Sequence, residues 1–187
     1  ESVSRLPPSR LFPAAPPPPR CFSSRALLRW DYGYQIAGLA NRTTLADGNT
    51  WNHEHIATLG RCLTSNEKDA HRNVRHLADY VLVWAGGGSD DLAKSPHMAR
   101  IGNSVYDDIC PGDPTCQQYG FMQSRYPGGQ PEPTPMMAES LLYKLHSAGI
   151  SPGVSVDPNR FHNVFNSKYG RVRIWKVLGV SAESKAW

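Results

Sequence analysis

Two aromatic residues flank a carboxylate in the segment Trp30-Asp31-Tyr32-Gly33-Tyr34. A carboxylate accepts hydrogen bonds, whereas the indole N–H of tryptophan donates one. Because a hydroxyl group both donates and accepts, Trp30 and Asp31 together could bind the side chain of a serine or threonine. From the residues alone a structural alternative stays open, in which Trp30 belongs to the core and Asp31 caps the following helix.

A second group of candidates consists of Asp91, Lys94 and Met98. Spacings of three and four residues predict that their side chains share one face of a helix. The structural alternative is an exposed ion pair between Asp91 and Lys94, worth about 0.3 kcal/mol, with Met98 as a core residue. Neither group alone decides between binding and structure.

Other possible sites carry weaker signals. His53 and His55 lack the H-E-x-x-H spacing of a zinc helix. The glycines at 86–88 follow a predicted strand but match no phosphate-binding loop, so a nucleotide site is only a remote alternative. Cys110 and Cys116 enclose two prolines and a glycine, and could form a disulfide in an oxidising compartment or stay free in the cytosol. Cys62 is expected to be a buried thiol.

Strands and helices alternate along the chain from residue 26, which predicts an α/β fold. We expect a layered domain with a short, mostly parallel sheet and flanking helices. Pro96 should break or kink its helix, and residues 107–135 should form a long loop. The expected strands are Ala26–Trp30, Arg42–Leu45, Tyr80–Trp84 and Arg171–Val177, and the expected helices are Tyr34–Ala40, Asn52–Leu63, a helix capped by Ser65 that runs to Ala78, Asp90–Ser104 and Met136–Ala148.

The first 25 residues differ in composition from the rest. They hold seven of the sixteen prolines, so we expect residues 1–25 to be a disordered tail and residues 26–187 to be the folded domain. Residues 1–29 contain five arginines and one acid, whereas residues 30–187 contain 15 basic and 15 acidic residues. The folded part thus lacks the excess positive charge that nucleic-acid binding requires. No apolar stretch is long enough to cross a bilayer.

Several longer motifs resemble the catalytic subunit of eukaryotic oligosaccharyltransferase, and most of all the single-subunit enzymes of trypanosomatid protists. The resemblance covers residues 28–187. Its motifs are Trp30-Asp31-Tyr32-Gly33-Tyr34-Gln35-Ile36-Ala37-Gly38, Asn41-Arg42-Thr43-Thr44, Asn49-Thr50-Trp51-Asn52, Asp79-Tyr80-Val81-Leu82-Val83, the Asp91-x-x-Lys94-x-x-x-Met98 helix and Val172-Arg173-Ile174.

This resemblance implies a role for each candidate residue. The family transfers an oligosaccharide from dolichyl diphosphate to the asparagine of Asn-x-Ser/Thr sequons, and Trp30 and Asp31 match the motif that binds the sequon hydroxyl. Asp91, Lys94 and Met98 match the helix beside that pocket, where Met98 would contact the threonine methyl and favour threonine by up to about 0.8 kcal/mol. Tyr34 matches the tyrosine that contacts the lipid-linked donor.

The chain also departs from the family pattern. Arg29 replaces the first tryptophan of the motif, which should weaken acceptor binding by about 1–3 kcal/mol. The membrane region that binds Mn²⁺ or Mg²⁺ and the donor lipid has no counterpart here, so no catalytic residue or metal ligand is assigned. We therefore expect a lumenal fragment of an endoplasmic-reticulum membrane enzyme, inactive in transfer by itself, whose partners are acceptor polypeptides and the dolichyl-linked donor. The alternative is a stand-alone, non-catalytic module that binds Ser/Thr peptides.

Overall fold

The computed structural model describes residues 24–86, 90–120, 122–123, 127, 129 and 132–186. At its centre is a five-stranded sheet, whose neighbours in space are β2 (Thr43–Thr44), β1 (Arg25–Leu27), β3 (Tyr80–Trp84), β7 (Val172–Val177) and β6 (Phe161–Asn166). β1 runs parallel to β2 and β3, whereas β7 is antiparallel to β3 and β6. The α/β class and the layered arrangement are confirmed, with a mixed sheet whose parallel side is formed by β2, β1 and β3.

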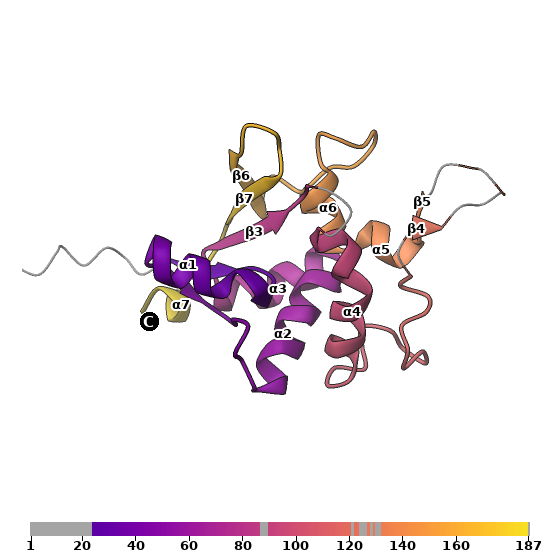
Figure 1. Ribbon diagram of the computed structural model, residues 1–187, viewed down its shortest axis with the longest axis horizontal. Coiled ribbons are helices and arrows are strands. Elements are labelled where there is room, and N and C mark those ends of the chain that lie inside the picture. The colour runs from indigo at the N-terminus through magenta and orange to yellow at the C-terminus, as the bar shows by residue number, and fades with distance from the viewer. Residues whose placement is uncertain are drawn as a thin grey trace, which may run out of the picture.

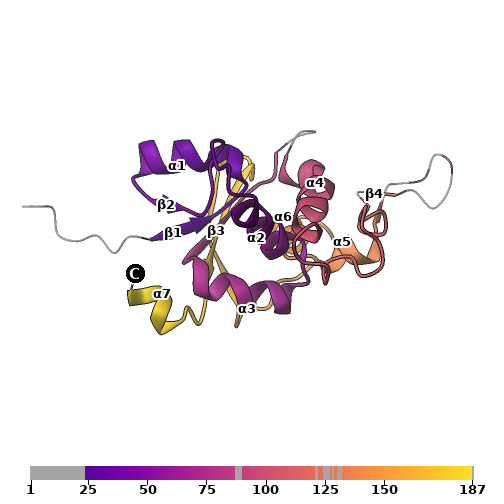
Figure 2. The same ribbon diagram turned by 90° about the horizontal axis from the view of Figure 1, so that it is seen from below.

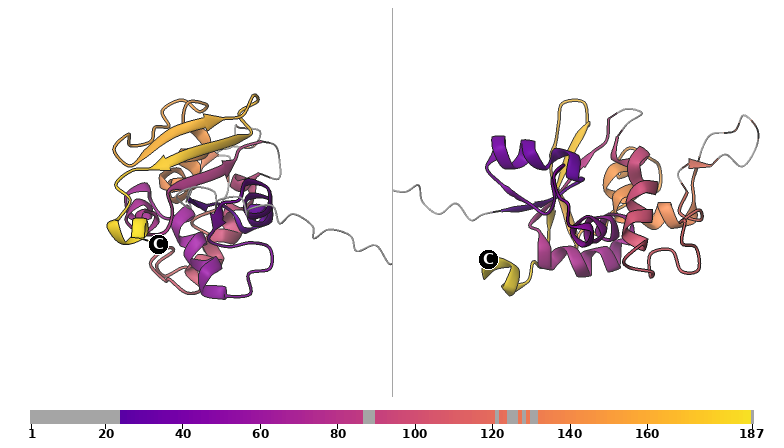
Figure 3. Two further views of the ribbon diagram at one scale, coloured as in Figure 1. Left: turned by 90° about the vertical axis from the view of Figure 1, so that its left-hand side faces the viewer. Right: turned by 60° about the horizontal axis from the view of Figure 1, so that its bottom comes forward.

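Helices cover the two faces of the sheet unequally. α2 (His53–Thr64), α3 (Glu67–Leu77) and α6 (Leu141–Ser147) lie on one side, and α4 (Asp91–Asn103) packs against α2 and α6 (Figures 1 and 2). α1 (Gly33–Ala40) lies on the opposite side, next to β2 (Figure 3). Val81 and Val83 of β3 and Trp175 and Val177 of β7 alternate into the main core under the first group of helices.

The remaining elements are short. The 3-10 helix η1 (Trp30–Tyr32) precedes α1, α5 (Pro135–Glu139) precedes α6, and β4 (Met122–Gln123) pairs with β5 (Glu132–Pro133). α7 (Ala182–Ala186) closes the described chain. Arg25, the first residue of β1, donates from its guanidinium to the carbonyl and hydroxyl of Ser184 in α7. The two ends of the described domain therefore meet.

Local hydrogen bonds explain where the elements differ from the sequence prediction. The predicted strand Ala26–Trp30 ends at Leu27, and Trp30 begins η1. Asn66 caps α3 in place of Ser65, because its side chain accepts a bond from Asp69 N at 3.0 Å. The predicted helix Met136–Ala148 is divided at Ser140, which is extended and caps α6 by accepting a bond from Tyr143 N at 3.2 Å. β6 and α7 were not predicted.

Pro96 neither breaks nor ends α4, contrary to expectation. The ring nitrogen of Pro96 has no hydrogen, so it cannot donate to the carbonyl of Leu92 one turn earlier. Ser95 supplies the missing bond, because its hydroxyl donates to the Leu92 carbonyl at 2.7 Å and its side chain is fully buried. The helix tolerates Pro96 because the Leu92 carbonyl, which would otherwise lack a donor, accepts a bond from the Ser95 hydroxyl.

Replacing Ser95 with alanine is therefore expected to lower the free energy of unfolding by about 1–2 kcal/mol, because it leaves a buried carbonyl without a donor. Chemical denaturation would measure the change. Ser104 makes a similar bond to the carbonyl of Ile101 at an exposed position, so Ser104→Ala should change stability by no more than about 0.5 kcal/mol. Equal losses in the two variants would contradict this account of Pro96.

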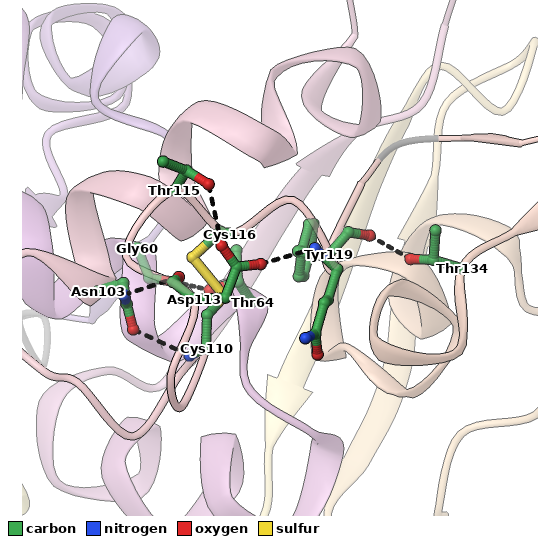
Figure 4. Close-up of a disulfide and its surroundings, with 10 residues drawn as sticks. Gly60, Thr64, Asn103, Cys110, Asp113, Thr115, Cys116, Tyr119 and Thr134 are labelled. Atoms are coloured by element: carbon green, nitrogen blue, oxygen red, sulfur yellow. Dashed lines mark hydrogen bonds between the residues drawn. A yellow bond between two sulfur atoms is a disulfide. The ribbon is translucent and has the colours of Figure 1, made fainter.

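A second cluster of buried side chains lies beside α4, held together by a disulfide between Cys110 and Cys116 (Figure 4). The loop between them is fixed to α4, because Asn103 accepts a bond from Cys110 N at 2.9 Å. Cys62 lies in the main core, and burial raises the pKa of its thiol to about 12, in agreement with the predicted buried cysteine. The second cluster consists of Leu92, Ala99, Ile109, Cys110, Cys116, Tyr119, Met137 and Tyr143.

Two expectations concern the chain outside this core. Among the residues that the structure describes, no helix has the length and apolar character needed to span a bilayer. The predicted proline-rich tail, residues 1–25, lies almost entirely outside the described residues and stays a prediction.

Candidate functional site

The candidate residues come together at one edge of the sheet. β1 and β3 are parallel neighbours, so their carboxyl ends lie at the same edge. η1 follows β1 there, and α4 begins seven residues after the end of β3. Ligands of open α/β sheets commonly bind outside the carboxyl ends of the strands. The topology thus brings Asp31 and Asp91, sixty residues apart in the chain, to one place.

Arg29 joins the two carboxylates. Its Nε lies 2.6 Å from Asp31 Oδ2 and 3.4 Å from Asp91 Oδ1. Its Nη2 donates to the Tyr32 hydroxyl at 3.1 Å, with the guanidinium 5.1 Å from the centre of that ring. Neither carboxylate contact has the angle of a hydrogen bond, and Nη1 is buried without a partner. Arg29 is therefore held chiefly by charge, in a site that does not satisfy all its donors.

The two carboxylates have different environments. The side chain of Asp31 is 47% exposed, whereas that of Asp91 is 2% exposed. Burial raises the pKa of Asp91 to about 6, although the bond that Asp91 Oδ2 accepts from Trp84 N at 2.8 Å and the charge of Arg29 both lower it. Asp91 therefore serves as an internal anchor for Arg29, and Asp31 is the carboxylate that a ligand can reach.

Two stacked aromatic side chains lie beside this ion-paired group. The rings of Tyr32 and Trp84 are stacked, with centroids 5.7 Å apart and planes 22° from parallel. Burial, followed by the charge of Asp91, raises the pKa of the Tyr32 phenol to about 12. The phenol is therefore neutral at physiological pH and can accept the bond from Arg29.

The start of α4 is fixed from a second side. Asp90 caps the helix by accepting a bond from Ala93 N at 3.0 Å, and its other carboxylate oxygen lies 3.2 Å from His146 Nε2. His146 belongs to the last turn of α6. α4 is thus bound to α6 at the same end that presents Asp91, which limits the movement of that carboxylate.

The predicted site residues differ in burial and in the contacts that they make. Trp30 is half-buried against the main core, and its indole N–H makes none of the described hydrogen bonds. Asp31 caps neither η1 nor α1, so the capping alternative is wrong. Asp91 pairs with Arg29, and the alternative ion pair with Lys94 is not among the described contacts. Tyr34 is 49% exposed on α1.

The prediction that Asp91, Lys94 and Met98 lie on one helical face agrees with α4, in which the three positions fall within an arc of about 60°, but their side chains differ in burial. Asp91 and Met98 are buried, since seven residues make nearly two full turns. Lys94 is exposed at the edge of this arc, about 60° around the helix axis from Asp91. Met98 has no exposed surface and lies within the main core. No described contact connects Lys94 or Met98 to Asp31.

Sequence reasoning missed how Arg29 acts. It treated this residue as a replacement for an indole, whereas the structure uses the guanidinium to join two acids. The closeness of Arg29 to Asp31 in the sequence was the one signal for this ion pair, which forms where extended Arg29 leads into η1. The contacts of Arg29 with Asp91 and of Tyr32 with Trp84 had no signal in the sequence. These residues are far apart in the chain, and only the parallel pairing of β1 with β3 brings them close together.

The described residues do not fit the divalent metal that the family resemblance implies. Among them, no three His, Cys, Asp or Glu side chains are placed to hold a metal ion. Asp31 and Asp91, the most suitable ligands by type, already face Arg29. His53 lies against Ser104, and His71 against the carbonyl of Leu178. No step of the proposed function below passes through a metal in this chain.

Comparison with known proteins gives two kinds of similarity. The dolichyl-diphosphooligosaccharide–protein glycosyltransferase subunit STT3 of Dictyostelium discoideum is 40% identical over 155 residues, which are 79% of this chain and 21% of that protein. The corresponding subunit of Schizosaccharomyces pombe is 39% identical over 133 residues, or 68% of this chain and 17% of that protein. The chain thus spans about a fifth of the length of the curated relatives it matches.

The similarity of structure agrees with that of sequence. The C-terminal domain of Campylobacter jejuni PglB superposes with a TM-score of 0.53 at 12% identity, covering 82% of this chain and 93% of that one. At this identity the match shows a shared fold. No family model matches the chain.

Proposed function

Because the chain belongs to the family of STT3 glycosyltransferase subunits, with the fold of their C-terminal domain, we propose that it recognises the hydroxyl of Asn-x-Ser/Thr acceptor sequons through Trp30 and Asp31. The observation that carries the proposal is the half-exposed carboxylate of Asp31, held at the edge of the sheet by a buried arginine. The Asp31 carboxylate would accept a hydrogen bond from the hydroxyl, and the Trp30 N–H would donate one to the hydroxyl oxygen.

Asp31 has one oxygen to spare for this task. Oδ2 faces Arg29, whereas Oδ1 makes none of the described contacts. Arg29 would fix the orientation of the carboxylate, so that its free oxygen can accept a hydrogen bond from a hydroxyl. Arg29 would also compete with the ligand for the Asp31 carboxylate. We therefore expect acceptor binding to be weaker than it would be with a tryptophan at position 29.

The other predicted residues have secondary roles in this proposal. Asp91 positions Arg29 from inside the protein, and Lys94 stands on the exposed side of α4, where an acceptor chain could pass. Contact of Met98 with a threonine methyl stays a prediction, and it requires the core around Met98 to open. Tyr34, exposed on α1, would face the donor lipid.

The rest of the reaction is assigned to the longer protein. We propose that the relatives' remaining length supplies the divalent metal, Mn²⁺ or Mg²⁺, and the groove for the dolichyl diphosphate oligosaccharide. The domain would then act on the lumenal side of the endoplasmic-reticulum membrane. The 187-residue chain by itself is expected to transfer no oligosaccharide to an acceptor peptide, and transfer by the purified chain would contradict this assignment.

Titration of short peptides into the purified chain tests the recognition step. An Asn-x-Thr peptide should bind about tenfold more tightly than Asn-x-Val, which has the same shape but no hydroxyl. Asp31→Ala should remove this preference without lowering the melting temperature greatly, since Asp31 is half-exposed. Calorimetry would measure both affinities.

The matched control for this titration is Asp107→Ala, which removes an exposed carboxylate from the loop after α4. It should leave the preference for threonine unchanged. Equal binding of the Thr and Val peptides to the native chain, or an unchanged preference in Asp31→Ala, would refute recognition by Asp31.

A further inference from the structure

The hairpin formed by β6 and β7 carries exposed aromatic side chains at and beside its turn. Tyr169 is 77% exposed, Phe165 is 50% exposed and Val164 is 46% exposed. The bulge between Asn163 and Phe165 interrupts the pairing with β7 at Val164. Large apolar side chains gathered at one tip, away from the core, commonly mark a contact surface.

The same segment is strongly basic. Residues 158–180 contain five lysines and arginines and no aspartate or glutamate. Two of the five are engaged inside the protein, because Arg173 is buried and Arg160 pairs with Asp157. Within the described chain, Lys168, Arg171 and Lys176 are exposed and form no ion pair. Their charges are therefore available to an anionic partner.

The turn is held rigidly in this exposed position. Gly170 N donates to Ser167 O at 2.8 Å, and Gly170 has φ of 66°, a conformation that glycine adopts without strain. Below the turn, Arg173 donates to Asn166 Oδ1 at 3.1 Å and to the carbonyls of Leu145 and Ala148 at 3.1 and 2.7 Å. The hairpin is thus fastened to α6, and presents its tip without needing to fold on a partner.

The tip combines charge and aromatic surface in one place. Lys168 and Tyr169 are adjacent, and Lys168 Nζ lies 5.5 Å from the centre of the Tyr169 ring. Both views of Figure 3 show the hairpin turn and α1 projecting on the same side of the molecule. α1 exposes Tyr34 and Leu39, the latter at 87%. Two separate projections on one side of the molecule can both contact a flat surface, whereas a bound peptide usually lies in a groove.

We propose that the β6–β7 hairpin tip is a membrane-contact site, which places Phe165 and Tyr169 in the interfacial region of a bilayer while Lys168 and Arg171 bind anionic lipid headgroups. Aromatic side chains with a polar end favour the membrane–water interface, and each nearby lysine or arginine strengthens attraction to an anionic surface. The contact is independent of sequon recognition, because it uses none of the residues around Asp31.

Fluorescence of a labelled hairpin tests this directly. Val164→Cys in a Cys21→Ser background of the whole chain would carry an environment-sensitive NBD label, which leaves Phe165, Lys168 and Tyr169 intact. Vesicles of phosphatidylcholine with about 30% phosphatidylserine should shift its emission to the blue and protect it from an aqueous quencher, more than vesicles of phosphatidylcholine alone. A Lys68→Cys label on exposed α3 should not respond.

Variants in the labelled chain assign the effect to the tip. Phe165→Ser with Tyr169→Ser should lower the partition coefficient at the label about tenfold, and Lys168→Glu should lower it about tenfold on the anionic vesicles. Trp51→Ser removes an aromatic side chain that is 92% exposed and makes none of the described cation–π contacts. Lys68→Glu changes an exposed lysine on α3. These two controls should bind as the native chain does.

Several results would overturn the proposal. These are an unshifted hairpin label on anionic vesicles, hairpin variants that respond like the native chain, or a label that responds to a soluble acidic peptide and not to vesicles. Circular dichroism of each variant would verify that the fold is unchanged, which is expected because the substituted side chains are exposed. Peptide binding through Asp31 is measured separately, so failure of one proposal leaves the other standing.

Discussion

Replacing Arg29 with methionine is expected to lower the free energy of unfolding at pH 7 by about 3–5 kcal/mol, the usual cost of removing one member of a buried ion pair. Methionine preserves much of the volume but leaves Asp91, which is 2% exposed, without its cation, so that Asp91 must either keep a buried charge or take up a proton. Asp31 suffers less, because water can reach it. Urea denaturation of the purified chain would measure the loss.

The stability that Arg29→Met loses should depend on pH, and the pKa of Asp91 determines the direction of this dependence. Burial raises this pKa from 3.8 to about 6. Between these values the unfolded chain has lost the proton that the folded protein keeps, so stability from this group falls as pH rises from about 4 to about 6 and then stays level. Without Arg29 the pKa of Asp91 should rise further, since the arginine charge lowers it. Arg29→Met should thus cost much less at pH 5 than at pH 7.

A double variant provides the control for this ion pair. Asp91→Asn removes the buried charge and retains an oxygen that can accept the bond from Trp84 N. Arg29→Met with Asp91→Asn should therefore recover most of the stability at pH 7. A loss that is equal at pH 5 and pH 7, or one that the second substitution does not relieve, would show that Arg29 contributes packing alone.

Gly60 should be among the least replaceable glycines of the described domain. It lies in α2 where this helix crosses α4, and a Cβ at Gly60 would stand 2.5 Å from the carbonyl oxygen of Met98 and 3.2 Å from Gly102 N. Both contacts are with backbone atoms, which cannot move away by a change of rotamer. Gly60→Val is expected to cost more than about 3 kcal/mol or to prevent folding, because the two helices must separate.

Gly60→Ala and Gly38→Ala make a matched pair for measuring this effect. Alanine improves helix propensity by about 1 kcal/mol in both helices, and a Cβ at Gly38 would meet nothing within 4 Å. Gly38→Ala should therefore raise the melting temperature, whereas Gly60→Ala should lower it. A stabilised Gly60→Ala protein would mean that α2 and α4 are not held at this distance.

The elements with strong local signals were predictable from the sequence. The continuous apolar run Tyr80–Trp84 became β3, and the alternating segment ending at Val177 became β7. β6 was not predicted, because its outward side chains include His162 and Asn166 and only Phe161 is fully buried. Its pairing with β7, rather than its own composition, makes it a strand.

Only the part of the candidate site that we propose to face a ligand was predictable from the sequence. Trp30 and Asp31 follow one another, so their chemistry could be inferred directly from the sequence. The supporting half depends on contacts between distant residues, such as Arg29 with Asp91 and Tyr32 with Trp84. The break expected at Pro96 was wrong for a related reason, since the general rule for proline does not consider the hydroxyl of the preceding serine.

The bonds between Arg25 and Ser184 bring the start of the first strand and the last helix to one corner of the domain. Because these bonds join β1 to α7, the two elements should move together and not independently. Asp31 lies only six residues after Arg25, so a movement of this corner would be passed to the candidate site through β1.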